Sequence, residues 1–307
     1  MTKYINSIIE TIHNTPLLRL NNLEKKYNLK NKIFVKLEYL NPFGSIKDRI
    51  VLSMIEDAEK RGKITPAKNT IIESTSGNTG IALASVGRLK GYRVVIVMSE
   101  DASIERRKII KHLGAELVLV PSSMSRLEMF EEVKRLTEEN DGYYWLNQYA
   151  NKANPEVHYK NTAQEIWQDL DGNVDIFVSG LGTGGTVSGV GKYLKTKNSE
   201  LELIGVEPKD KAHHTIEGLQ PVNNTKDGFV PEVMNLDLMD EVLEVENEDA
   251  FVYSRELSSV EGVTAGISSG ASLKAVLEID KKHEDKNIVF IAQDNFYRYL
   301  STGLFKE

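Results

Sequence analysis

Short apolar runs typical of buried β-strands alternate along this chain with stretches typical of helices. Five such runs are 33–37, 94–98, 117–120, 176–178 and 288–291. Strands that alternate with helices form parallel sheets whose faces are covered by the helices. The chain has 307 residues, 40% of them apolar, which exceeds a usual single domain and can support a large core. We therefore predict an α/β fold with two lobes.

A short loop rich in Gly, Ser and Pro places Lys47 directly before a stretch, 48–61, that is typical of a helix. An amine forms an imine only when it is uncharged, and the positive field of a helix N-terminus favours the neutral form of a base. Lys47 is therefore a candidate Schiff-base anchor. A lysine taken alone is most often a solvated surface residue, so this interpretation depends on two further loops.

The first of these loops, 73–80, follows the apolar segment 70–72 and precedes a helical run at 81–86. It holds five hydroxyl or amide side chains and two glycines. Side-chain donors and free backbone N–H groups at such a strand-to-helix turn form a cradle for an anion. The turn suits a substrate carboxylate.

The second loop, 178–186, lies between a predicted strand at 174–178 and a predicted helix at 187–194. Its glycines let the backbone approach a phosphate closely, and its two threonines add hydroxyl donors. Dinucleotide sites of the G-x-G-x-x-G type look similar and are the alternative. The acidic residue that such a site needs for the ribose is not clearly placed, although Glu207 is a candidate.

Together with these loops, five further motifs occur in the order found in one enzyme family: 14–20, 106–108, 154–159, 165–167 and 299–302. With them the chain resembles the cysteine synthase and cystathionine β-synthase family, whose members use pyridoxal 5′-phosphate (PLP) and have the type II, tryptophan synthase β-like fold. The resemblance implies two lobes, each a mostly parallel twisted sheet flanked by helices. A small mobile lobe at 38–147 would carry the carboxylate loop, and a large lobe at 1–37 and 148–307 would carry the phosphate loop.

The resemblance also assigns site residues. Lys47 would hold PLP as the internal aldimine, and Asn78 would lie beside the 3′ oxygen of the cofactor. The phosphate would be held by Gly182, Thr183, Gly184, Gly185 and Thr186. The α-carboxylate of the substrate would be bound by Thr75, Ser76, Thr79 and Gln148, with Asn78 beside them.

At the pyridine nitrogen, members of the family usually present a serine after a proline, whereas the segment 291–299 of this chain contains neither residue. Counting back from Arg298 and Tyr299, Asn295 takes the place of the serine. Its amide N–H can donate to an unprotonated ring nitrogen. Asp294 is the alternative, and it would protonate the ring if it faced inward.

A second departure from the family lies in the loop 218–229, where cysteine synthases have a Gly-Ala-Gly-Phe-like segment over the site. Here Asp227 stands where a small neutral residue is usual. A carboxylate would repel incoming HS⁻, but it could act as general base for a neutral nucleophile such as water. The alternative is that Asp227 stabilises a surface turn, which is a common role of Asp before Gly.

The chemistry follows from the resemblance. PLP acts as an electron sink, so the freed amine of Lys47 can remove the Cα proton, and loss of the β-substituent gives α-aminoacrylate. We expect L-cysteine to be activated with release of hydrogen sulfide, followed by addition of water, which gives L-serine, or of another small nucleophile. The alternative is O-acetylserine sulfhydrylase (cysteine synthase), and the third is a condensation of cystathionine β-synthase type. A hypothesis of another class is a non-catalytic partner of a serine acetyltransferase tail.

Composition argues against several other classes of function. A net charge of −7 would repel nucleic acid and anionic membranes. No apolar run reaches the roughly 18 residues of a membrane span, and the N-terminus lacks the apolar core of a signal peptide, so we expect a cytoplasmic protein. The chain has no cysteine, and its six histidines form no metal-binding pattern, so no metal site is predicted. The family resemblance adds an expected homodimer and a small amino-acid substrate.

Overall fold

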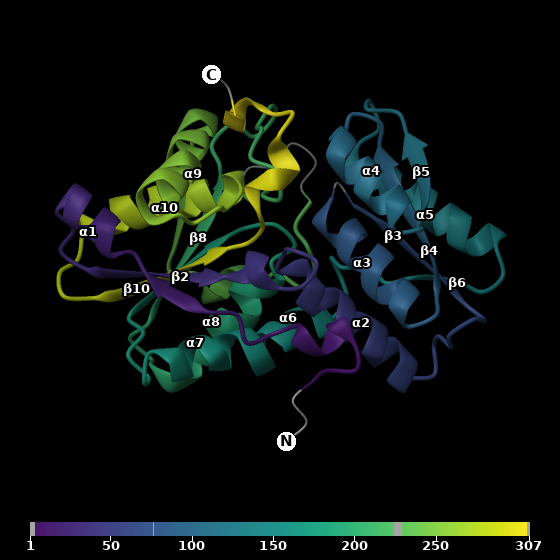
Figure 1. Ribbon diagram of the computed structural model, residues 1–307, viewed down its shortest axis with the longest axis horizontal. Coiled ribbons are helices and arrows are strands. Elements are labelled where there is room, and N and C mark those ends of the chain that lie inside the picture. The colour runs from purple at the N-terminus through teal and green to yellow at the C-terminus, as the bar shows by residue number, and fades with distance from the viewer. Residues whose placement is uncertain (1–3, 76, 224–228, 306–307) are drawn as a thin grey trace.

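The computed structural model describes residues 4–75, 77–223 and 229–305, and it contains two sheets in two lobes (Figure 1). The large sheet has the strand order β1-β2-β10-β7-β8-β9, and the small sheet has the order β5-β4-β3-β6. The β1 strand is antiparallel to β2, and every other neighbouring pair in these two orders is parallel. The predicted α/β fold with mostly parallel sheets is confirmed.

The strands divide between two parts of the chain. Those of the large sheet are β1 (Leu17–Arg19), β2 (Lys32–Leu37), β7 (Ile176–Gly180), β8 (Glu202–Pro208), β9 (Glu241–Val245) and β10 (Asn287–Ala292). Those of the small sheet are β3 (Thr70–Ser74), β4 (Arg93–Ser99), β5 (Glu116–Val120) and β6 (Tyr143–Trp145). All five apolar runs picked out in the sequence form strands, in β2, β4, β5, β7 and β10.

The α-helices connect these strands. They are α1 (Asn21–Tyr27), α2 (Lys47–Lys60), α3 (Asn78–Leu89), α4 (Ile104–His112), α5 (Arg126–Glu139), α6 (Ala153–Val157), α7 (Ala163–Asp169), α8 (Gly185–Lys197), α9 (Asn247–Glu261) and α10 (Ile267–Asp280). Short 3-10 turns are Ile8–Thr11, Glu38–Leu40, Leu236–Leu238, Phe296–Tyr299 and Gly303–Phe305, and His158–Thr162 forms a π-helical turn between α6 and α7.

Both faces of the large sheet are buried, which explains why its strands are apolar at successive positions. Successive side chains of a strand point to opposite faces. In β10, Ile288 and Phe290 pack with α9 and α10 on one face, whereas Val289 and Ile291 pack with α7 and α8 on the other. These helix pairs lie on opposite sides of the sheet in Figure 1.

The small sheet is built in the same way. In β4, Ile96 and Met98 pack with α2 and α3 on one face, and Val95 and Val97 pack with α5 on the other. The strands of this sheet all lie between residues 70 and 145, and those of the large sheet lie outside that interval. The predicted lobe boundaries at 38 and 147 lie outside the strands, and the mobility of the small lobe stays a prediction.

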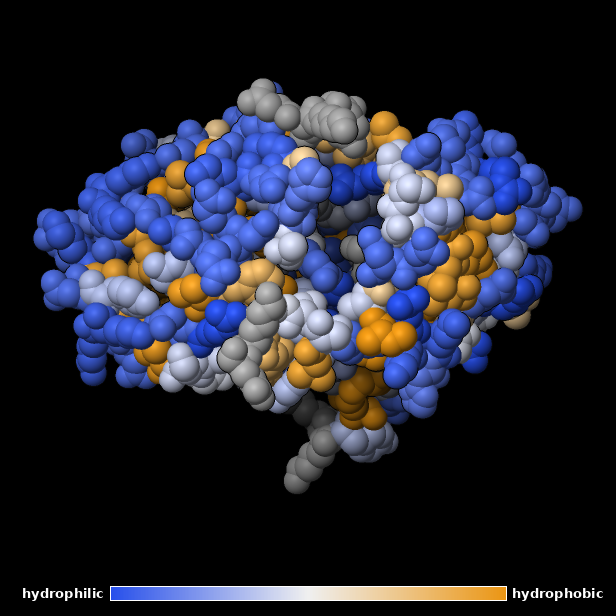
Figure 2. All heavy atoms as spheres, turned by 90° about the horizontal axis from the view of Figure 1, so that it is seen from above, coloured by the Kyte–Doolittle hydropathy of each residue, from blue (hydrophilic) through white to orange (hydrophobic). Residues whose placement is uncertain are grey.

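The segments that follow β2, β3, β7 and β10 leave the sheets at the carboxyl ends of parallel strands. In open α/β sheets this edge is where ligands bind. Residues from all four segments line one cavity between the lobes, and Figure 2 shows the surface hollowed there.

Candidate active site

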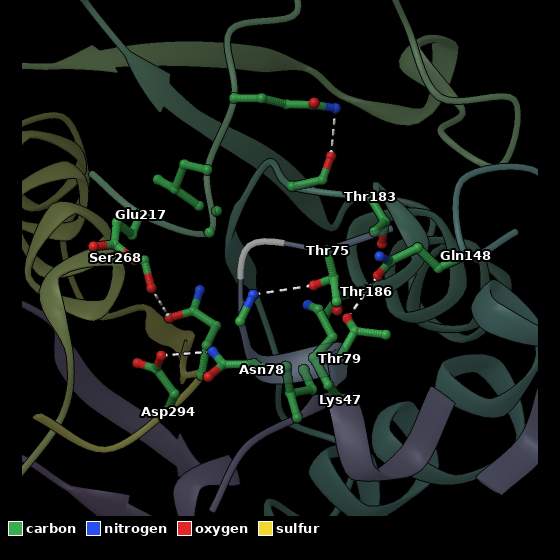
Figure 3. A pocket seen from close by; sticks show the side chains of 18 of the residues that line it. Lys47, Thr75, Asn78, Thr79, Gln148, Thr183, Thr186, Glu217, Ser268 and Asp294 are labelled. Carbon is green, nitrogen blue, oxygen red and sulfur yellow. Dashed lines mark hydrogen bonds between the residues drawn. The ribbon is translucent and has the colours of Figure 1, made fainter. Parts of the chain in front are cut away.

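The cavity between the lobes brings together the three loops that the sequence singled out (Figure 3). Lys47 comes from the start of α2, Thr75 from the turn between β3 and α3, and Thr183 from the turn between β7 and α8. Residues far apart in the sequence therefore meet because each follows a strand at the same edge of its sheet. Each of the three loops forms one part of the candidate active site.

Lys47 is the first residue of α2 and is half-buried in the cavity wall. Its backbone N–H donates to the hydroxyl oxygen of Ser45 at 3.2 Å, which satisfies one free donor of the helix N-terminus. Burial lowers the pKa of the Lys47 amine, and the negative charge of Asp294 opposes this shift only in part. The neutral amine that Schiff-base chemistry needs is thus favoured chiefly by burial, an effect that the sequence argument did not include.

Hydroxyl and amide groups of the predicted carboxylate loop make hydrogen bonds within the cavity wall. The hydroxyl oxygen of Thr75 accepts a hydrogen bond from the backbone N–H of Gly77 at 3.1 Å. The Thr79 hydroxyl donates to Oε1 of Gln148 at 2.7 Å, and both of these side chains are buried. Ser76, the remaining member of the predicted set, lies outside the described residues. The structure brings the other members into one cavity, and their binding of a carboxylate stays a prediction.

Glu73 is a fully buried carboxyl group behind this loop, and the sequence did not single it out. Its Oε1 accepts hydrogen bonds from the backbone N–H of Ser74 and the indole N–H of Trp145, each at 3.1 Å. Its Oε2 accepts from the backbone N–H of Gln148 at 3.2 Å. Burial raises the pKa of Glu73 to about 7, although these hydrogen bonds act in the opposite direction. Because all three partners donate, the ionised form fits best.

We expect Glu73→Gln to raise KM for the amino-acid substrate about tenfold with a smaller change in kcat. The NH₂ group of the new amide would face N–H groups that also donate, and this repulsion would displace Gln148. In the unaltered protein, KM should rise as pH falls through about 7, since protonation of Glu73 has the same effect. Steady-state kinetics across this pH range measure both effects. Glu116→Gln, at an exposed residue of β5, is the matched control. An unchanged KM with no pH dependence would refute this role.

The predicted phosphate loop is a glycine turn at the N-terminus of α8. Gly184 has a φ of 84°, a conformation that favours glycine. A Cβ atom at Gly185 would overlap the Asn154 side chain, and one at Gly182 would overlap the carbonyl oxygen of Gly218. The turn therefore needs glycine at these positions, which keeps its backbone N–H groups accessible to an anion.

Thr183 and Thr186 complete this turn. The hydroxyl oxygen of Thr183 accepts a hydrogen bond from Nδ2 of Asn154 at 3.1 Å. The Thr186 hydroxyl lies 3.3 Å from Nε2 of His158. Burial lowers the pKa of His158 well below its usual range, with a further contribution from the positive charges of Arg49 and Lys47. Since this imidazole is neutral, attraction of the turn for an anion comes from the backbone and the α8 dipole.

The opposite side of the cavity contains Ser268, in the first turn of α10, and Asp294, which follows β10 (Figure 3). Asp294 is 1% exposed, and its Oδ2 accepts hydrogen bonds from Nδ2 of Asn78 and from the Tyr299 hydroxyl, each at 2.6 Å. Its Oδ1 has no partner among the described residues. The Ser268 hydroxyl donates to Oε1 of Gln293 at 3.3 Å.

Asn295 does not line this cavity, contrary to the prediction that its amide faces the ring nitrogen. Its Oδ1 accepts a hydrogen bond from the backbone N–H of Tyr297 at 2.9 Å, and its Nδ2 donates to the hydroxyl of Thr264 at 3.0 Å. The side chain is therefore used to stabilise the turn after Asp294. Of the two sequence alternatives, only Asp294 lines the cavity.

Ser268 was missed by the sequence reasoning, although a signal was present. The segment 266–270 is a Gly/Ser-rich stretch at the start of a helix, and the two turns that were singled out also lead into helices. Only the fold reveals its position, because α10 packs beside β7 and β10. Ser268 and Asp294 thus line the cavity on the same side.

Two arginines of the small lobe line the same cavity and contact the large lobe. Arg106, from α4, forms an ion pair with Glu217, and its guanidinium lies 4.9 Å from the ring centre of Tyr299. Arg126, the first residue of α5, donates to Oε1 of Gln220. These contacts cross between the lobes at the cavity.

Asp227, the predicted general base, lies outside the described residues. Among residues 4–75, 77–223 and 229–305, no group of three or more His, Asp or Glu side chains could hold a metal ion. In the same part of the chain, no helix is long and apolar enough to cross a membrane.

Comparison with known proteins gives consistent similarities. A family model described as pyridoxal-phosphate dependent enzyme matches residues 8–294. Cysteine synthase of Staphylococcus aureus (strain N315) is 42% identical over 99% of this chain and 98% of its own, and cysteine synthase A of Escherichia coli (strain K12) is 42% identical over 100% and 97%. The crystal structure of a hydrogen sulfide-producing enzyme from Fusobacterium nucleatum is 40% identical with a TM-score of 0.91, covering 97% of this chain and 100% of that one.

Proposed function

Because this chain belongs to the family of pyridoxal-phosphate dependent enzymes and is of the cysteine synthase type, we propose that it activates L-cysteine, releases hydrogen sulfide and adds water or another small nucleophile at the β-carbon. The observation that carries this proposal is the meeting of Lys47, the carboxylate loop and the glycine turn in one cavity. The likeness to a hydrogen sulfide-producing enzyme over the full chain supports L-cysteine as the first substrate.

The residues of the cavity fit PLP. The glycine turn from Gly182 to Thr186 would hold its phosphate, since side chains are excluded there and backbone donors remain. Lys47 would bind its carbonyl carbon, and Asn78 would lie near its ring hydroxyl. The unpartnered Oδ1 of Asp294 or the hydroxyl of Ser268 would face its nitrogen. When bound, PLP supplies an electron sink for the bonds at the α-carbon.

The side chains of this protein would then act in sequence. Thr75, Thr79 and Gln148 would hold the α-carboxylate, which orients the Cα–H bond toward Lys47. The neutral amine of Lys47 would take the α-proton and later return it. The ion pair between Arg106 and Glu217 would restrict entry of stray water between the lobes.

For addition of water, Asp227 is the proposed general base, because a carboxylate can accept the proton of a neutral nucleophile. The second candidate is synthesis of cysteine from O-acetylserine and sulfide, which the 42% identity to cysteine synthases favours. A condensation of cystathionine β-synthase type is third. The two main candidates use the same carboxylate loop and the same lysine, and differ in leaving group and nucleophile.

A direct comparison of the two reactions tests the proposal. The purified protein with PLP is given L-cysteine alone, with sulfide, serine and pyruvate measured, and separately O-acetylserine with sulfide, with cysteine measured. We expect the higher kcat/KM for sulfide release from L-cysteine. Rapid cysteine formation with negligible sulfide release would instead support the cysteine synthase function.

The proposal includes a homodimer in the cytoplasm, as expected from the family. A serine acetyltransferase tail would be a partner only under the cysteine synthase alternative. Light scattering of the purified protein, alone and mixed with such a tail peptide, distinguishes these assemblies.

A further inference from the structure

We propose that Arg298 is a positioning residue of the cofactor site, which holds the side-chain amide of Asn78 with an N–H group toward the ring hydroxyl of PLP. This role rests on the proposed function through the position given there to Asn78. Arg298 lies behind Asn78 and outside the lining of the cavity, so it would act on the cofactor only through that amide.

The two partners of the Asn78 side chain fix the orientation of its amide. Oδ1 of Asn78 accepts a hydrogen bond from Nη1 of Arg298. Nδ2 of Asn78 donates to Oδ2 of Asp294 at 2.6 Å (Figure 3). A guanidinium can only donate, so the amide oxygen must face Arg298 and the amide nitrogen must face Asp294. The NH₂ group has two N–H donors, and the second one remains for a ligand in the cavity that Asn78 lines.

The turn after β10 places Arg298 at this position. Arg298 is 6% exposed and belongs to the 3-10 turn Phe296–Tyr299. Asn295 precedes this turn, and its side-chain oxygen accepts from the backbone N–H of Tyr297 at 2.9 Å. The amide that was expected at the cofactor ring therefore stabilises the turn from which Arg298 reaches Asn78.

The same guanidinium also contacts the loop that carries Lys47. Nη2 of Arg298 donates to the carbonyl oxygen of Phe43. Gly44 has a φ of 82°, and a Cβ atom there would lie 2.8 Å from Nη2, so the close approach of the guanidinium to this loop needs glycine. With its two amino groups, Arg298 connects the lysine loop to the amide of Asn78.

The charges around Arg298 explain what its loss would do. Burial lowers the pKa of Arg298, whereas the negative charges of Asp294 and Asp48 raise it. A guanidinium nevertheless stays protonated in proteins, so it can serve as a permanent donor. Without it, the amide of Asn78 would be held at its nitrogen only and would be free to rotate. The N–H group would then no longer be fixed toward the ring hydroxyl.

The test measures binding of the cofactor and needs no substrate. PLP, and an analogue in which hydrogen replaces the ring hydroxyl, are titrated into the full-length protein from which PLP has been removed, and Kd is measured for each. Arg298→Met should reduce the preference for PLP over the analogue about tenfold, because a hydrogen bond to the ring hydroxyl is lost. Comparing the two ligands in each protein cancels any general loss of affinity.

The absorption spectrum of the holoenzyme is a second readout, since the ionised and neutral forms of the ring hydroxyl absorb at different wavelengths. A fixed N–H donor favours the ionised form. In Arg298→Met, the spectrum at a given pH should therefore shift toward the neutral form. A purely structural role of Arg298 would change the amount of bound PLP and leave the shape of its spectrum unaltered.

Three further variants make the binding result specific. Asn78→Ala should show the reduced preference by itself, and adding Arg298→Met to it should cause no further reduction. Arg298→Lys keeps a charged donor without the planar fork and should retain part of the preference. It decides the question by the same ratio if Arg298→Met does not fold. Arg255→Met is the matched control, because Arg255 donates to the carbonyl oxygens of Gly303 and Leu304 in the same C-terminal segment.

An unchanged preference in Arg298→Met, or a further reduction when it is combined with Asn78→Ala, would overturn the role of Arg298. If L-cysteine releases no sulfide, the proposed function fails, and the binding measurements still decide the role of Arg298 because they use the cofactor alone.

Discussion

Replacing Lys47 by alanine should lower sulfide release from L-cysteine by at least about a thousandfold, because in the proposed mechanism this one side chain both binds the cofactor and moves the α-proton. Burial lowers the pKa of this amine and so favours the form that does both. The rate of sulfide release in the variant, saturated with PLP, measures the loss. A second readout is independent of activity. Borohydride, which fixes a carbonyl cofactor to the amine that holds it, should label the peptide containing Lys47 in the unaltered protein.

Lys60→Ala is the matched control, since Lys60 is the exposed last residue of the same helix. It should keep its activity and its borohydride label. If Lys47→Ala retained most of the activity, or if the label appeared on another lysine, the cavity described here would not be the active site.

The second large effect is expected on the stability of the fold, and it concerns Arg49, two residues after Lys47 in α2. Arg49 is fully buried and donates to Oε1 and Oε2 of Glu38 at 2.6 to 2.7 Å and to both carboxylate oxygens of Glu165 at 2.7 Å. Arg49→Met would leave Glu38, also fully buried, without its cation. Breaking a buried pair in this way costs about 3 to 5 kcal/mol of unfolding free energy.

Urea denaturation of the two proteins measures this difference, with the midpoint expected to fall and the slope to stay similar. The control is Arg135→Met, which removes a solvent-exposed pair and should change stability by less than about 1 kcal/mol. Equal stability of Arg49→Met and the unaltered protein would show that the cluster does not hold α2, and with it Lys47, in place.

The strands of this fold were predictable because parallel sheets bury both faces. Apolar residues at consecutive positions, as in 288–291, are needed when alternate side chains enter different cores. The helix that follows Lys47 was also predicted, and it begins one residue earlier than expected, at Lys47 itself. The glycine turns were recognisable because glycine is required where a side chain would overlap a neighbour, as at Gly185.

The remaining site residues depend on tertiary contacts that a linear pattern does not contain. Asn295 was preferred by counting residues, but the backbone after β10 directs Asp294 into the cavity and uses Asn295 in a turn. Glu73 lies among strand residues, and its burial behind Gln148 becomes visible only when β3 and β6 pair. Arg126 and Gln220 meet across the two lobes, 94 positions apart in the chain.

The central claim is that L-cysteine undergoes β-replacement in this cavity, and its most direct test is the product balance from L-cysteine in water that carries a heavy oxygen isotope. We predict that each sulfide released is matched by one β-substituted alanine, either L-serine with the isotope at its hydroxyl group or the product formed with another small nucleophile. Absence of sulfide, or sulfide matched by pyruvate alone, would contradict the account.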